Sequence, residues 1–144
     1  MPASSLTTDP LPRLAVLVSG AGSNMVAIAR ACAEGRIPAR VSAVIADIPD
    51  AGGLQRAREM GLEAITVDRR AFRDTAGKHD RAAFESALDA AIESAGADFI
   101  ILAGFMRVLS PAFVQRHLGR LLNIHPSLLP RYKGLDTHAR ALAA

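Results

Sequence analysis

Cysteine is nearly absent from this sequence, since Cys32 is the only one among 144 residues. A single thiol excludes an intrachain disulfide and a cysteine-based metal cluster. Because Cys32 falls inside an apolar helical pattern, we interpret it as a buried, unreactive thiol and not as a nucleophile. No metal is expected from the histidines either, because no ligand spacing matched with acids occurs around His79, His117, His125 and His138.

Aromatic residues are also scarce, with five Phe, one Tyr and no Trp. No block of basic residues is interleaved with them, which excludes a base-stacking platform and predicts that no nucleic acid is a partner. The formal net charge of +3 suits an anionic small molecule instead.

Long hydrophobic runs are missing as well. None approaches the roughly 20 residues that span a bilayer, so no membrane association is expected. Residues 1–12 contain no Lys and no Arg ahead of Arg13 and no continuous apolar stretch, which argues against a signal peptide and predicts a cytoplasmic protein. Their Pro, Ser and Thr content predicts a flexible extension, and residues 13–144 are enough for one α/β domain with a core.

Short apolar runs alternate along the chain with helical patterns. Strands are predicted at 14–18, 41–46, 64–67, 99–102 and 121–124, and helices at 24–34, 54–60, 81–95 and 111–118. This alternation predicts an α/β fold with a doubly wound, Rossmann-like, mostly parallel sheet in the order 3-2-1-4-5. Ligands of such sheets bind at the carboxyl ends of the strands, at the switch point between the first and fourth strands.

The turn Ser19-Gly20-Ala21-Gly22-Ser23-Asn24 follows the first predicted strand. Glycines at a helix start let backbone N–H groups approach an anion, so a phosphate monoester is the favoured ligand. A dinucleotide site, with Asp47 contacting ribose, is disfavoured because Met25 occupies the third position of the G-x-G-x-x-G pattern. A plain tight turn without a ligand stays open.

Asn123 and His125 lie two residues apart at the end of the fifth predicted strand. The period of a strand sends both side chains to the same face. An amide that donates to an oxyanion, beside an imidazole that stabilises the charge or passes a proton, suits acyl transfer. A hydrogen-bonded structural histidine is the alternative.

Three segments, in order, resemble the folate-dependent formyltransferases. Asn123 to Gly134 is similar to the signature of that family, and Ala103 to Pro111 is similar to the segment that lines its folate pocket. Ser19 to Asn24 resembles the phosphate turn of the phosphoribosylglycinamide branch in particular. The resemblance runs from Arg13 to the last residue.

The resemblance implies a set of functional residues. The phosphate of the substrate would be held by Gly22, Ser23 and Asn24. Folate would be contacted by Arg81, Met106, Arg107, Val108, Leu109 and Asn123. Asn123 would bind the formyl oxygen, and His125 would be the catalytic imidazole. The alternative to folate contact is a solvent-exposed charge on a helix for Arg81, and a residue of the ordinary hydrophobic core for Val108.

The implied reaction transfers a formyl group from 10-formyltetrahydrofolate to the amine of 5-phosphoribosylglycinamide in de novo purine biosynthesis, without a metal. Methionyl-tRNA formyltransferase and formyltetrahydrofolate hydrolase are the enzyme alternatives, with a nicotinamide-dependent oxidoreductase behind them. A non-catalytic phosphate-ligand-binding fragment is the alternative of another class. Monomer and homodimer both stay open.

The chain departs from the family downstream of His125. There the family carries a carboxylate that raises the imidazole pKa, and it would fall past Ala144. An unperturbed imidazole, with a pKa of about 6.5, is mostly neutral at pH 7. Asp136 is the nearest downstream acid, with nothing to show that it reaches His125. We therefore expect a sheet and a catalytic unit that are incomplete on the C-terminal side, in either a truncated chain or one that binds without catalysing.

Overall fold

The computed structural model describes residues 11–124. Residues 1–10 of the expected extension, His125 and Asp136 lie outside the described residues. So does a further helix that the sequence predicts to begin near Asp136 or Thr137. Within the described part, no helix has both the length and the apolar character needed to cross a membrane.

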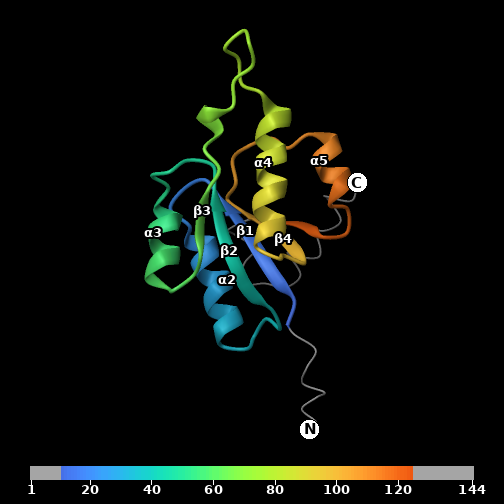
Figure 1. Cartoon of the computed structure of the whole chain (residues 1–144). Helices are drawn as coiled ribbons and strands as arrows, with labels where there is room; N and C mark the ends of the chain where they lie inside the picture. The colour runs from blue at the N-terminus through green and yellow to red at the C-terminus, as the bar shows by residue number, and fades with distance from the viewer. Residues whose placement is uncertain (1–10, 125–144) are drawn as a thin grey trace.

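A parallel sheet forms the middle of the molecule (Figure 1). Its strands are β1 (Arg13–Val18), β2 (Arg40–Ala46), β3 (Ala64–Thr66), β4 (Phe99–Ala103) and β5 (Leu121–Ile124). They lie in the order β3-β2-β1-β4-β5, and all neighbouring pairs are parallel. The predicted order is confirmed, and it places the switch point between β1 and β4.

Four helices connect these strands: α2 (Ser23–Ala33), α3 (Gly52–Glu59), α4 (Arg81–Ser94) and α5 (Pro111–Arg116). Each predicted helix is confirmed, with its ends shifted by two residues at most. Ser110 caps α5 as expected, because its side chain accepts a hydrogen bond from the Phe113 N–H and Pro111 takes the first helical position. The short 3-10 helix η1 (Arg69–Ala71) was not predicted.

The central positions of β1, β2 and β4 are apolar and buried because helices cover both faces of the sheet there. On one face, Leu14, Val16 and Val18 of β1 pack in a core with residues of α2 and α3. On the other face, Ala15 and Leu17 pack with residues of α4 and α5. The site at the carboxyl ends of the strands therefore rests on a scaffold that is buried from both sides.

Candidate functional site

The turn after β1 leads directly into α2. Gly22 is the N-cap of this helix, with φ of +82° and no side chain to cap it. In that conformation the first turn of α2 presents its backbone N–H groups, at the positive end of the helix dipole, without a capping oxygen from Gly22. The geometry fits the predicted anion site. Ser23 is exposed, and Asn24 is buried.

The same turn packs tightly on the start of α3. The Gly53 N–H donates to the Gly20 carbonyl oxygen at 2.9 Å. A Cβ atom on Gly22 would lie 2.6 Å from the Gly53 Cα. Gly22 is therefore required both by its left-handed backbone and by this close approach. The paired glycines Gly52 and Gly53 at a helix start were a signal of this contact that the sequence analysis missed.

The features that a dinucleotide site would need are used otherwise. Met25 is fully buried in the α2 core, where a third glycine would have allowed close packing. Asp47 is also buried, and its Oδ2 lies 3.4 Å from the Nε of Arg69 on η1. A buried carboxylate that faces a guanidinium is poorly placed to receive a ribose hydroxyl, which supports the interpretation against a dinucleotide. Sequence reasoning missed the role of Arg69 because η1 was not expected.

After β4 the chain leaves the sheet at Gly104, which has φ of +79°. Met106 and Val108 of the following segment are both 77% exposed, whereas Phe105 and Leu109 pack partly against the α4 and α5 core. The alternative that Val108 belongs to the ordinary core is wrong, because no element of the described structure covers this side of the segment. Two large apolar side chains exposed side by side suit a surface that binds an apolar ligand.

The turn after β1, the segment after β4 and the end of β5 come together at the switch point. The Ser19 N–H donates to the Gly104 carbonyl oxygen at 3.3 Å, and the Met106 N–H donates to Ser19 Oγ at 2.8 Å. These bonds join the turn after β1 to the segment after β4. Asn123 is paired with Leu102 in the adjoining strand β4, two residues before Gly104. The site of His125 lies outside the described residues.

Asn123 and Arg81 are both exposed at this edge of the fold. Asn123 lies two residues after Leu121 on β5, so the two side chains share a face of the sheet, and Leu121 packs in the α4 and α5 core. Arg81 is the first residue of α4, and the Asp80 carboxylate caps the helix by accepting from the Ala83 N–H. Within residues 11–124 no ion pair engages Arg81. Its guanidinium is thus available to a ligand.

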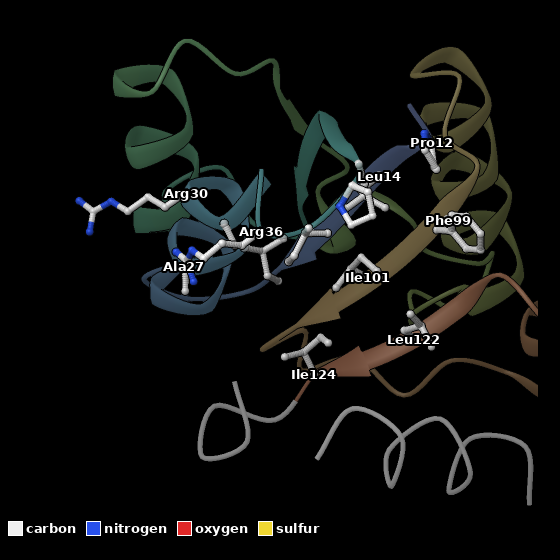
Figure 2. A pocket seen from close by; sticks show the side chains of 14 residues that line it. Pro12, Leu14, Ala27, Arg30, Arg36, Phe99, Ile101, Leu122 and Ile124 are labelled. Atoms are coloured by element: carbon white, nitrogen blue, oxygen red, sulfur yellow. The ribbon is translucent and has the colours of Figure 1, made fainter. Parts of the chain in front are cut away.

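One apolar cavity of the described structure lies elsewhere. It measures about 720 Å³ and lies between α2 and one face of β4 and β5. In Figure 2, Ile101, Leu122 and Ile124 project from the two strands, and the Arg30 side chain extends away from the cavity. None of the predicted site residues within 11–124 lines it. The polar groups gathered at the strand ends therefore identify the candidate site better than cavity size does.

No group of three or more metal-binding side chains occurs within residues 11–124.

Cys32 is half-buried on α2, and burial raises the pKa of its thiol. A raised pKa means a smaller thiolate fraction near neutral pH, and the thiolate is the reactive form. We expect iodoacetamide to alkylate Cys32 several-fold more slowly than a free cysteine at pH 8, with the rate rising at higher pH than for the free thiol. Mass spectrometry of the folded and the urea-unfolded chain measures this, and equal rates in both states would contradict the assignment of an unreactive thiol.

The doubly wound parallel sheet, with its glycine turn and exposed segment at the switch point, defines an α/β domain of the Rossmann-like class. The sequence model described as formyl transferase matches residues 12–144. The chain belongs to this formyl transferase family.

Comparison with individual proteins agrees with this family. The chain is 48% identical over 129 residues to phosphoribosylglycinamide formyltransferase of Escherichia coli (strain K12), covering 90% of this chain and 58% of that protein. It is 41% identical over 134 residues to the Haemophilus influenzae enzyme of the same name, covering 93% and 60%. The crystal structure of phosphoribosylglycinamide formyltransferase from Brucella melitensis superposes with a TM-score of 0.73 at 42% identity, covering 92% of this chain and 66% of that one. The chain thus spans about three fifths of the length of the first two relatives.

Proposed function

We propose that this chain carries the substrate-binding part of an enzyme that transfers a formyl group from 10-formyltetrahydrofolate to the amine of 5-phosphoribosylglycinamide, in purine biosynthesis. The observation that carries the proposal is the joining of the Ser19–Asn24 turn, the Gly104–Leu109 segment and the end of β5 at one edge of the sheet. The family and the named relatives support the same reaction.

The phosphate of the ribonucleotide would lie at the start of α2. Gly22 offers a left-handed backbone and an uncapped helix start, and Ser23 and Asn24 are the first two residues of the helix. Backbone N–H groups at such a position bind phosphate oxygens without a cationic side chain. This agrees with a turn that contains no lysine.

The formyl folate would lie on the segment after β4. The exposed side chains of Met106 and Val108 offer apolar contacts, and Arg107 and Leu109 complete the segment. A guanidinium at the start of α4, that of Arg81, would pair with a carboxylate of the folate in a charge-assisted hydrogen bond.

In the reaction, the neutral amine attacks the formyl carbon and forms a C–N bond, and the oxygen of the tetrahedral intermediate carries the negative charge. The Asn123 amide donates a hydrogen bond to this oxygen. His125 stabilises the same charge and passes a proton. The bond from the formyl carbon to the folate nitrogen then breaks, and that nitrogen takes up the proton that the amine loses.

A formyl-transfer assay tests the proposal. We expect formylation of 5-phosphoribosylglycinamide by the protein at the length of its relatives, with 10-formyltetrahydrofolate as donor and without added metal. Release of formate without transfer would favour the hydrolase, and formylation of methionyl-tRNA would favour that transferase. Tight binding of the phosphate substrate with no turnover at either length would favour the non-catalytic binding protein.

A cytoplasmic location forms part of this proposal. A single cysteine accords with a reducing compartment, where disulfides are rare.

A further inference from the structure

The segment from Gly104 to Ser110 carries two exposed apolar side chains, yet it is tied to the rest of the fold at both of its ends. At its start, Ser19 makes two hydrogen bonds with it, from its backbone N–H to the Gly104 oxygen and from the Met106 N–H to its Oγ. At its other end the partner is Glu85, from the middle of α4.

Glu85 is a carboxylate that is only 3% exposed. Both of its oxygens bind Ser110: the Ser110 N–H donates to Oε2 at 2.7 Å, and the Ser110 hydroxyl donates to Oε1 at 2.5 Å. The same hydroxyl oxygen accepts from the Phe113 N–H at 3.2 Å. A buried carboxylate needs such donors in place of water, so these bonds fix where the segment ends.

The position of Glu85 along α4 matters as well. It lies four residues, about one helical turn, after Arg81, on the same helix. The carboxylate therefore links the helix that presents Arg81 to the segment that presents Met106 and Val108. Asp89, one turn further along α4, bonds Arg116 and His117 at the far end of α5. Glu85 is the α4 residue whose described side-chain bonds engage the segment itself, at Ser110.

We propose that Glu85 and Ser19 are positioning residues that clamp the Gly104–Ser110 segment in the shape that binds the formyl folate. This rests on the proposed function, since the ligand is the donor of that reaction. Neither side chain contacts the ligand. Glu85 sets the segment against α4, and Ser19 sets it against the phosphate turn.

The test combines amide hydrogen exchange and folate binding on the whole 144-residue chain. Glu85→Ala is expected to speed exchange of the Ser110 amide about 10-fold or more, and Ser19→Ala that of the Met106 amide, because each of these amides loses its acceptor. Amides in β1 and β2 should keep their wild-type protection. The affinity for 5-formyltetrahydrofolate, a stable relative of the donor, should fall about 10-fold in Glu85→Ala. Glu85→Gln keeps one acceptor oxygen, so its affinity should lie between those of the wild type and of Glu85→Ala.

Matched controls lie on the same helix. Glu93→Ala removes an exposed carboxylate of α4 and Ser86→Ala an exposed hydroxyl, and both should leave exchange and affinity unchanged. If Glu85→Ala does not fold, Glu85→Gln and Ser19→Ala decide the question. Unchanged exchange at Met106 and Ser110, or wild-type folate affinity despite faster exchange, would overturn the clamp. A wild-type chain that binds no folate would instead count against the proposed function, and the exchange rates would still decide whether the clamp exists.

Discussion

Replacing Asn123 with alanine is expected to lower kcat for formyl transfer by roughly 10²–10³, the usual effect of removing one oxyanion donor. Asn123 is exposed at the end of β5, so the loss reflects chemistry and not core packing. Binding of the phosphate substrate, at the start of α2, should change little. Steady-state kinetics in the protein at the length of its relatives measure both quantities.

The matched control is Gln115→Ala, which removes an exposed amide from α5, away from the strand ends. It should keep wild-type kcat. Near-normal turnover in Asn123→Ala would remove this residue from the mechanism. The corresponding His125→Ala change is expected to abolish most turnover as well, through loss of the imidazole.

Gly22→Ala is expected to have the largest effect on stability. Its left-handed backbone costs an alanine about 1–2 kcal/mol. The new Cβ would also lie 2.6 Å from the Gly53 Cα, which forces the turn away from α3 and adds about 1–3 kcal/mol. The free energy of unfolding, measured in urea on the 144-residue chain, should therefore fall by about 2–5 kcal/mol. Phosphate binding should weaken in parallel.

Gly35→Ala separates the two causes. Gly35 has φ of +79°, close to that of Gly22, but a Cβ there meets nothing within 4 Å. Gly35→Ala should therefore lower the free energy of unfolding only by the cost of the left-handed backbone, about 1–2 kcal/mol. Equal losses in the two variants would show that the contact between the turn and α3 contributes nothing.

Much of the fold could be predicted because its signals are local. Each buried strand is a short apolar run, since a parallel sheet covered on both faces needs apolar residues at every position. Right-handed crossovers then leave few orders for the strands, and the order places Ser19 to Asn24, Gly104 to Leu109 and Asn123 at one edge. The predicted anion turn follows from two glycines before a helical pattern.

Other features depend on which elements meet. Valine is a residue type that is usually buried, yet Val108 is exposed because no described element packs over it. The bond between Glu85 and Ser110 joins residues 25 apart in sequence, and it requires a particular placement of α4 along the chain that follows β4. The ion pair between Asp47 and Arg69 depends on η1, which has no periodic pattern to reveal it.

The sequence by itself determined the order of strands, the helices and the residue types at the site, because local hydrophobic periods and turn residues specify these without reference to distant parts. Only the tertiary structure decided which side chains are exposed, that Gly22 and Gly53 touch, and that Ser19 and Glu85 hold the two ends of one segment. Such contacts are set by the packing of whole elements against each other, and a single sequence does not encode those distances locally.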